Sequence, residues 1–234
     1  MADNEIQVPE IDTKTSNQEI EPQQKKKKGV FEIILWVTLS LIILLSSTLI
    51  ILNRVVFFSV YVDGPSMSPT LRNGDVLFVS KNFEVKEGDI IVIDGEKENA
   101  DGTGYEWLIK RAILIGEKDA VKVVEIRDGK VFVGYKNQIL LELKEDYLPS
   151  GTVTEPDSSN KGANNKPISR WEIGEGEIFY LGDNRMDSAD SRSKYGTCKI
   201  SQVKGTVGDF ALSFRWLSGF MYDTSRFFSN LFGR

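Results

Sequence analysis

The sequence has no histidine and only one cysteine, Cys198, in 234 residues. A single cysteine excludes an internal disulfide and a cysteine zinc cluster, and the missing histidine excludes the ordinary transition-metal sites. Histidine is also the usual base that activates a catalytic serine, so such a serine would need another base here, for which lysine is the known alternative. Cys198 itself is expected to be a small, buried or half-buried apolar side chain.

A strong excess of charge of either sign is also missing. The net charge is −5, and this mild acidity gives no basic face of the kind that nucleic-acid binding requires. With 41% hydrophobic and 27% charged residues, the composition fits one membrane segment and one soluble domain that is large enough to bury its own core.

One long apolar run, Val30–Leu52, follows a polar tail at residues 1–29 that is expected to be disordered and cytoplasmic. The run is long enough for a transmembrane helix through the ~30 Å hydrocarbon core. Lys25–Lys28 precede it and the lone Arg54 follows it, which predicts a cytoplasmic N-terminus. A cleavable secretory signal would be shorter and end in a small-x-small site, which residues 53–58 do not offer. A single-pass anchor is therefore favoured over a cleaved signal or a soluble core helix.

Beyond the apolar run, short segments rich in β-branched and aromatic residues alternate with Gly, Asn and Asp, and no useful helical periodicity is present. Asp128-Gly129 between two such segments is typical of a type I′ hairpin. The sequence therefore predicts an all-β, mostly antiparallel domain over residues 53–212, with a polar, mobile loop at 144–170. The expected strands are Phe57–Val62, Asp75–Val79, Asp89–Ile93, Tyr105–Ile115, Val121–Ile126, Lys130–Val133, Glu177–Leu181 and Val203–Leu212.

An aromatic C-terminal segment occupies residues 213–234. Charged residues interrupt it too often for it to span a bilayer. Two interpretations stay open for it, namely an interfacial surface near the membrane and ordinary packing of a terminal strand and helix on the domain.

The first candidate for chemistry is Ser66, in the turn-rich segment Gly64–Leu71. Two prolines and a glycine enforce a defined, non-helical backbone that could expose the Ser66 hydroxyl at a fixed angle. On this segment alone, a plain turn without chemistry explains the pattern as well.

Lys110 lies in an otherwise apolar expected strand, next to Arg111. Alternation puts these two side chains on opposite faces, so one of them is expected to point toward the interior, where an ammonium group is costly. To be half neutral at pH 8, a lysine must have its pKa lowered from about 10.4 to about 8. Desolvation must disfavour its charged form by roughly 3.3 kcal/mol to do this. The alternative is a lysine whose ammonium reaches solvent from the strand.

A third cluster, Gly182–Arg192, follows the expected strand Glu177–Leu181 and is dense in small, acidic and basic residues. Such a segment is typical of a structured loop with internal hydrogen bonds. Asp190 and Arg192 are expected to pair and hold it.

Together these segments resemble the bacterial type I signal peptidases, membrane-bound serine proteases that remove signal peptides from secreted proteins. The family's Ser-Met-x-Pro-Thr-Leu box matches Ser66–Leu71, its Gly-Asp-hydrophobic-hydrophobic box matches Gly88–Ile91, and its Lys-Arg box matches Lys110-Arg111. The Gly-Asp-Asn-Arg box matches Gly182–Arg192 at every fixed position. The boxes occur in the family's order behind an N-terminal anchor, between about residues 30 and 212.

The resemblance implies the signal-peptidase β fold, shared with LexA-like proteins, and a role for each matched residue. Ser66 would be the nucleophile, with its backbone N–H at the oxyanion, and Lys110 the general base. Ser188 would orient the Lys110 amine by a hydrogen bond, and Asp190 with Arg192 would support the loop. The shallow pockets for the small substrate residues would be lined by Val60, Val62, Met67, Leu71, Leu108 and Ile109.

The chain departs from the family's pattern at two places. Some relatives carry a hydroxyl two residues before the nucleophile, where this chain has Gly64, which leaves the second oxyanion donor open. The compact ending after the Lys-Arg box is extended here to Gly116-Glu117-Lys118-Asp119, which affects the local turn.

The resemblance further implies exported preproteins as substrates, cut after small-x-small motifs, by an extracytoplasmic domain of a single-pass protein in the bacterial cell membrane. No metal or organic cofactor is implied, and a monomer is expected. Two alternatives remain: a LexA-like Ser/Lys autoprotease, which normally has a DNA-binding head, and a non-enzymatic, membrane-tethered binding module. The second would require Ser66 and Lys110 to lie far apart, whereas a distance of ~3 Å would favour the enzyme.

Overall fold

The computed structural model describes residues 29–98, 105–213, 215–216, 218–220 and 223. The chain divides into two compact units, with the boundary between Ser46 and Ser47. Nearly all of the predicted polar tail and most of the aromatic C-terminal segment lie outside the described residues.

The N-terminal helix α1 covers Val30–Val55, three residues beyond the predicted end of the apolar run. Its part Val30–Thr48 has a mean hydropathy of 2.3 and is long and apolar enough to cross a membrane. Three hydroxyl groups in this helix donate to backbone carbonyls one turn back, which reduces the cost of placing them in an apolar environment. These bonds run from Thr38 to the Leu35 carbonyl, from Ser40 to Trp36 and from Ser46 to Ile43, at 2.9, 2.8 and 3.0 Å.

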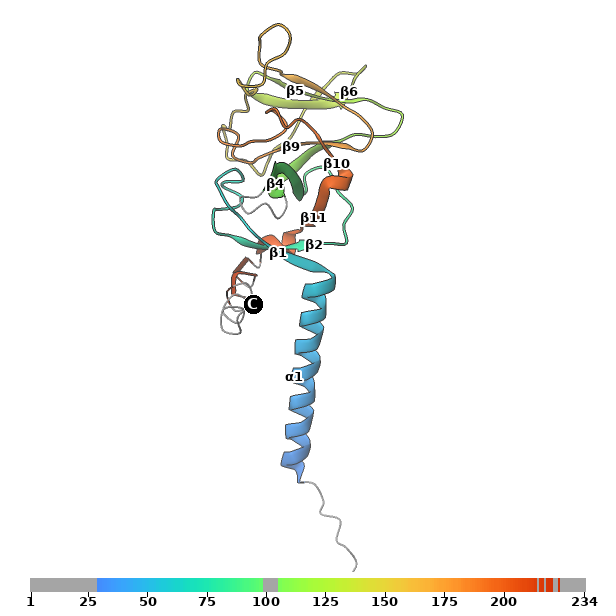
Figure 1. Ribbon diagram of the computed structural model, residues 1–234, viewed down its shortest axis with the longest axis vertical. Helices are drawn as coiled ribbons and strands as arrows, with labels where there is room; N and C mark the ends of the chain where they lie inside the picture. The colour runs from blue at the N-terminus through green and yellow to red at the C-terminus, as the bar shows by residue number, and fades with distance from the viewer. Residues whose placement is uncertain (1–28, 99–104, 214, 217, 221–222, 224–234) are drawn as a thin grey trace, which may run out of the picture. The chain divides into compact units, whose positions relative to one another are not determined.

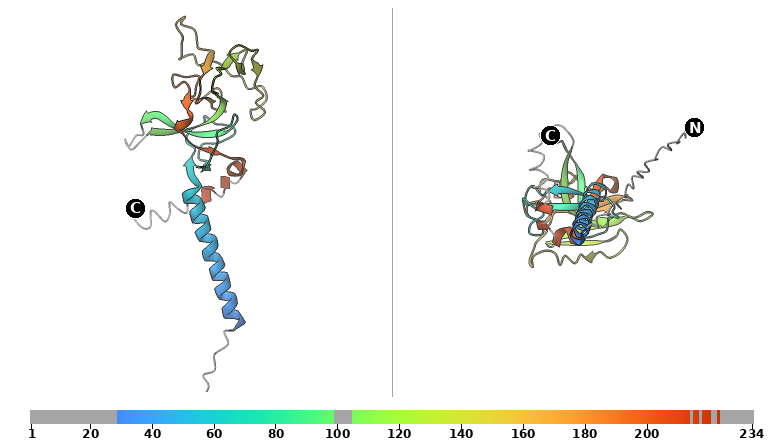
Figure 2. Two further views of the ribbon diagram at one scale, coloured as in Figure 1. Left: turned by 90° about the vertical axis from the view of Figure 1, so that its right-hand side faces the viewer. Right: turned by 90° about the horizontal axis from the view of Figure 1, so that it is seen from below.

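The second unit is built from two antiparallel sheets, which confirms the predicted all-β domain (Figure 1). The larger sheet has the strand order β1-β2-β11-β3-β4-β9-β10 and the smaller one β7-β6-β5-β8. Figure 2 shows β3 and β4 as a long two-stranded ribbon. The strands are β1 Phe57–Tyr61, β2 Val76–Ser80, β3 Ile90–Glu98, β4 Tyr105–Ile115, β5 Lys122–Arg127, β6 Lys130–Tyr135, β7 Leu141–Glu142, β8 Arg170–Ile173, β9 Glu177–Leu181, β10 Cys198–Lys199 and β11 Val203–Val207, with a 3₁₀ turn at Ile200–Gln202.

The predicted hairpin between β5 and β6 is confirmed, including its turn type. Arg127 faces Lys130 across the hairpin, and both turn residues have positive φ, 51° at Asp128 and 74° at Gly129, as a type I′ turn requires.

One predicted strand is wrong at its C-terminal end. Val203–Leu212 was expected to be a single strand, but β11 ends at Val207 and helix α2 begins at Asp209 and ends at Ser213. Gly208 separates the two elements, and Asp209 in the first turn suits the positive end of the helix dipole. The short strands β7, β8 and β10 were missed because two to four residues carry no measurable alternation.

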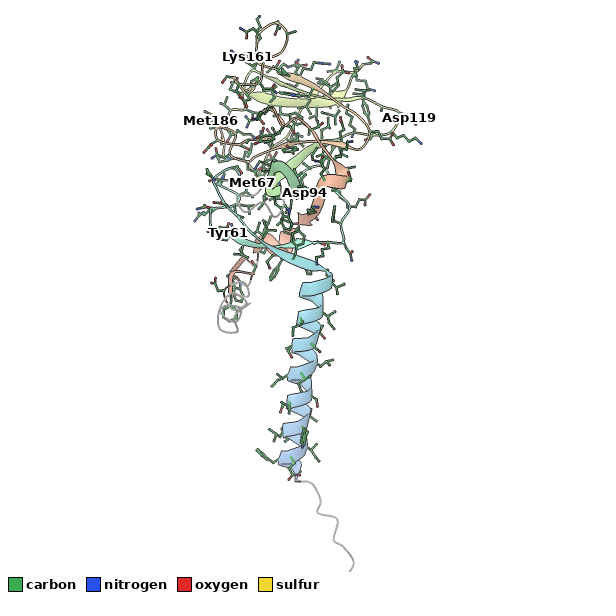
Figure 3. The ribbon with its side chains drawn as sticks, viewed as in Figure 1. Tyr61, Met67, Asp94, Asp119, Lys161 and Met186 are labelled. Carbon is green, nitrogen blue, oxygen red and sulfur yellow. The ribbon has the colours of Figure 1, made fainter. Side chains whose placement is uncertain are left out.

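The core positions the segment around Ser66. Met67 and Leu71 are fully buried in a cluster formed with Val60, Val62 and strands β2 and β3. These two buried side chains fix the backbone on either side of the turn residues Ser68–Thr70. Met67 is labelled in Figure 3, inside the domain.

The extended turn after β4 is tightly packed at its first residue. The Gly116 N–H donates to the Glu177 carbonyl at 2.8 Å, and a β-carbon on Gly116 would lie 1.7 Å from the Gly174 carbonyl oxygen. The turn continues through a bridge between Glu117 and Ala120. Only glycine fits at position 116.

We therefore expect Gly116→Ala to lower the free energy of unfolding by about 2 kcal/mol or more, because backbone atoms must move to admit the methyl group. Gly208→Ala is the matched control, since a β-carbon there meets nothing within 4 Å, and it should change stability by less than about 0.5 kcal/mol. Urea unfolding of both variants measures the difference. Equal stabilities would contradict the packing described at Gly116.

Candidate active site

Ser66 and Lys110 come together although 44 residues separate them in sequence. Lys110 lies in β4 opposite Ile91 of β3, and its Nζ donates to Ser66 Oγ at 2.8 Å and to the Ile109 carbonyl at 2.9 Å. The Lys110 residue is only 4% exposed, whereas Ser66 is half-buried. The pairing predicted from sequence is therefore formed, with the hydroxyl on the accessible side of the amine.

Burial lowers the pKa of Lys110 from its ordinary value of 10.5 to about 8. The negative charges of Asp190 and Asp183 act in the opposite direction and raise it, but desolvation is the larger effect. A substantial fraction of Lys110 is therefore neutral near pH 8, and a neutral amine can accept a proton.

Lys110 is buried, as expected for one of the two neighbouring charges, and Arg111 beside it on β4 is buried as well. The Arg111 guanidinium donates to both carboxylate oxygens of Asp183, at 2.8 and 2.6 Å, and to the Gly88 carbonyl at 2.7 Å. β4 lies between β3 and β9 inside the sheet, and both of its faces are covered at this point. The bidentate ion pair compensates the buried charge.

The loop at residues 182–192 is held from within, as predicted. Asp190 is fully buried and accepts hydrogen bonds from Arg192 Nε and Nη2 at 2.9 Å each, and from the Gly182 N–H at 3.0 Å. Arg192 also donates to the Arg185 carbonyl at 2.8 Å. The Asp190–Arg192 pair thus ties both ends of the loop together.

Ser188 is placed near Ser66, but its predicted hydrogen bond to Lys110 is not formed. Ser188 Oγ is buried and has no hydrogen-bond partner in the described structure. A β-carbon on Gly182 would lie 2.2 Å from Ser188 Oγ and 2.4 Å from the Ser66 carbonyl oxygen, so all three residues meet at Gly182. Only glycine allows this approach.

The six residues predicted to line substrate pockets do not form one group. Five belong to a single buried cluster, whereas Leu108 packs against a different one, around Ile91, Ile93 and Tyr180. The five are largely inaccessible core residues, namely Val60, Val62, Met67, Leu71 and Ile109.

The backbone at Gly64 explains why this position has no hydroxyl-bearing residue. Gly64 has φ of 94°, in a region that L-residues other than glycine rarely adopt, and its N–H donates to Asn73 Oδ1 at 2.9 Å. A serine at position 64 would be strained in this turn.

Several residues of the 144–170 segment contact the site loop, which was not predicted from the sequence, and three of them pair with Arg185. Arg185 donates to Glu145, to Tyr147 and to Thr154 Oγ1, the last at 2.7 Å. The only hint in the sequence was the charge of Arg185 itself, because a buried arginine needs a carboxylate partner.

Comparison with known proteins agrees with this geometry. A model of the family described as signal peptidase, peptidase S26, matches residues 33–211. Signal peptidase I of Bacillus licheniformis is 32% identical over 192 residues, covering 80% of this chain and 90% of the relative. Signal peptidase I T of Bacillus subtilis (strain 168) is 30% identical over 205 residues, covering 83% and 92%. Signal peptidase I of Streptococcus pneumoniae serotype 4 is 31% identical over 183 residues, covering 69% and 86%. The matched region contains the Ser66–Lys110 pair and the whole 182–192 loop, and the chain belongs to the signal peptidase family, peptidase S26.

Proposed function

We propose that this chain is a membrane-anchored serine endopeptidase that removes signal peptides from exported preproteins, with Ser66 as its nucleophile and Lys110 as its general base. The observation that carries the proposal is the 2.8 Å contact between Ser66 Oγ and the amine of a buried lysine. Membership of the signal peptidase family supports the reaction and the substrate class.

In the proposed reaction, neutral Lys110 takes the proton of the Ser66 hydroxyl while Oγ attacks the carbonyl carbon of the scissile peptide bond. The Ser66 backbone N–H donates to the oxyanion that forms. The protonated lysine then gives its proton to the leaving amine, which is the new N-terminus of the mature protein. A water molecule, deprotonated by Lys110, hydrolyses the acyl-enzyme and restores the hydroxyl.

Ser188 is proposed to orient the Lys110 amine during this cycle. A neutral amine whose lone pair faces the Ser66 hydroxyl has two N–H groups that need hydrogen-bond acceptors. The Ile109 carbonyl accepts from one of them. The unpartnered Ser188 Oγ beside Gly182 is a suitable acceptor for the other. Asp190 and Arg192 support this arrangement through the loop.

The substrate requirement is proposed to be a small-x-small motif before the cut. This requirement rests on membership of the signal peptidase family, since the residues expected to line the pockets, such as Val62 and Met67, are buried in this structure. The fit of α1 to a bilayer and the lysines before it support an anchor with a cytoplasmic N-terminus and an extracytoplasmic catalytic domain.

The two alternative functions lose their support. The non-enzymatic module required Ser66 and Lys110 to lie apart, and they are in contact. The LexA-like autoprotease normally has a DNA-binding head, whereas an apolar helix precedes the β domain here, and the signal peptidase family model matches residues 33–211.

The direct test is to incubate the purified full-length protein with a preprotein whose signal peptide ends in a small-x-small motif, and to locate the cut by mass spectrometry. We expect one cut, directly after that motif, and none with Ser66→Ala. Cleavage elsewhere, or equal cleavage by Ser66→Ala, would refute the proposed reaction.

Activity should rise with pH around a midpoint of about 8, because the pKa of Lys110 is lowered to about 8 and only its neutral form accepts the Ser66 proton. Lys110→Arg should be inactive throughout, since a guanidinium stays charged at any pH that the protein survives. Ser188→Ala should retain more activity than Lys110→Ala, because it removes an orienting contact rather than a reacting atom. The kcat of these variants between roughly pH 6 and 10 provides the measurement. Substantial turnover by Lys110→Arg would place the base elsewhere.

Protease added to intact spheroplasts should digest the domain that follows residue 57 and leave residues 1–29 protected, because the lysines before α1 stay in the cytoplasm. Antibodies against each end of the chain report which part survives. Digestion of the N-terminal tail alone would reverse the proposed orientation.

A further inference from the structure

We propose that Glu145 and Tyr147 are positioning residues that hold the reacting groups in place through Arg185. The inference rests on the proposed function of Ser66 and Lys110. Both residues lie in the polar segment between β7 and β8, outside the four sequence boxes that carry the family resemblance.

The central contact is a bidentate ion pair between Arg185 and Glu145. Arg185 Nη1 donates to Glu145 Oε2 at 3.0 Å and Nη2 donates to Oε1 at 2.5 Å. The arginine side chain is fully buried and that of the glutamate is 14% exposed, so the pair is shielded from water and from salt. The Tyr147 hydroxyl donates to Glu145 Oε1 at 2.8 Å and accepts from Arg185 Nη2 at 3.2 Å.

Arg185, held by Glu145 and Tyr147, in turn fixes the backbone that packs against Ser66. Its Nε donates to the Gly182 carbonyl at 3.0 Å, while Asp190 accepts the Gly182 N–H from the other side. Gly182 therefore has both of its backbone polar groups fixed. Its α-carbon packs against the Ser66 carbonyl oxygen and Ser188 Oγ so closely that a β-carbon would clash with both.

Tyr147 also contacts a residue of β4. The Tyr147 ring stacks on the Arg111 guanidinium, with 3.9 Å between Arg111 Cζ and the ring centroid. Arg111 is the neighbour of Lys110 on the strand, and it is paired with Asp183. Glu145 and Tyr147 are thus connected to both parts of the site. Arg111 links Tyr147 to the strand that carries Lys110, and Arg185 links both residues to the loop that borders Ser66.

Geometry at a reacting pair has a large effect on rate, because a displacement of 1 Å can cost about 100-fold. Removing the Glu145 charge leaves Arg185 buried without a carboxylate, so its guanidinium and the Gly182 carbonyl that it holds are expected to shift. Glu145 is not proposed to contact the substrate, so the KM for the substrate should change little.

The experiment compares Glu145→Gln, Tyr147→Phe and the control Glu142→Gln in the full-length protein, with kcat and KM measured on a preprotein. Glu142 belongs to the same region and pairs with Lys130, but both of these side chains are half exposed. Rates are expressed per folded molecule, with the folded fraction taken from circular dichroism. Ser66→Ala is included, because a wild-type protein no faster than Ser66→Ala would show that the proposed function itself fails.

We expect Glu145→Gln to lower kcat by about 10- to 100-fold with KM within about twofold and with an unchanged midpoint of the pH profile. Tyr147→Phe, which keeps the ring on Arg111 but removes the hydroxyl, should lower kcat several-fold. Glu142→Gln should stay within about twofold of the wild type. Arg185→Lys combined with Glu145→Gln should be no slower than the slower single variant, because both act through one contact.

Three results would overturn the proposal. One is a kcat per folded molecule of Glu145→Gln equal to that of Glu142→Gln, and another is a double variant whose losses multiply. The third is a pH profile of Glu145→Gln shifted to lower pH with a gain in activity, since that would mean a direct charge effect on Lys110. If Glu145→Gln does not fold, an unimpaired Tyr147→Phe would overturn it by itself.

Discussion

The burial of Lys110 beside Ser66 is the constraint on which the rest of this domain depends. An ordinary lysine is charged at neutral pH and cannot take a proton, so the proposed role of Lys110 as the general base depends on its desolvation. Lowering its pKa from 10.5 to about 8 corresponds to about 3 kcal/mol of disfavoured charge. The fold supplies this by putting Lys110 on β4, a strand with neighbours on both sides, and by anchoring the Ser66 turn with the buried side chains of Met67 and Leu71. The serine hydroxyl thereby reaches the amine from the half-exposed side.

The same site contains two carboxylates that act against this effect. Asp183 and Asp190 both raise the pKa of Lys110, but less than burial lowers it. Each carboxylate is paired with a buried arginine, Asp183 with Arg111 and Asp190 with Arg192. These two ion pairs compensate the buried charges and hold the loop at residues 182–192 in place.

The sequence predicted the parts of this structure that local patterns and ordered motifs determine. The apolar run predicted α1, the Asp128-Gly129 pair predicted the hairpin, and the order of the boxes predicted the contact between Ser66 and Lys110. It could not predict contacts that only the tertiary fold creates. The segment at residues 144–170 was expected to be a mobile loop because it is polar and aperiodic. Its mobility stays a prediction, but Glu145 and Tyr147 in it pair with a buried arginine 40 and 38 residues away. The burial of Arg111 was missed because alternation assigns one face to solvent, whereas both faces of β4 are covered here.

The most direct test is a titration of the Lys110 amine itself, followed by NMR of the lysine side-chain Cε in protein labelled at lysine. Lys110→Arg identifies the resonance by its disappearance, and Ser66→Ala shows whether the serine contributes to the shift. We expect a midpoint near pH 8, because burial outweighs the two carboxylates. A midpoint at or above the ordinary value of 10.5 would contradict it, since Lys110 would then be charged throughout the working range and could not act as the base.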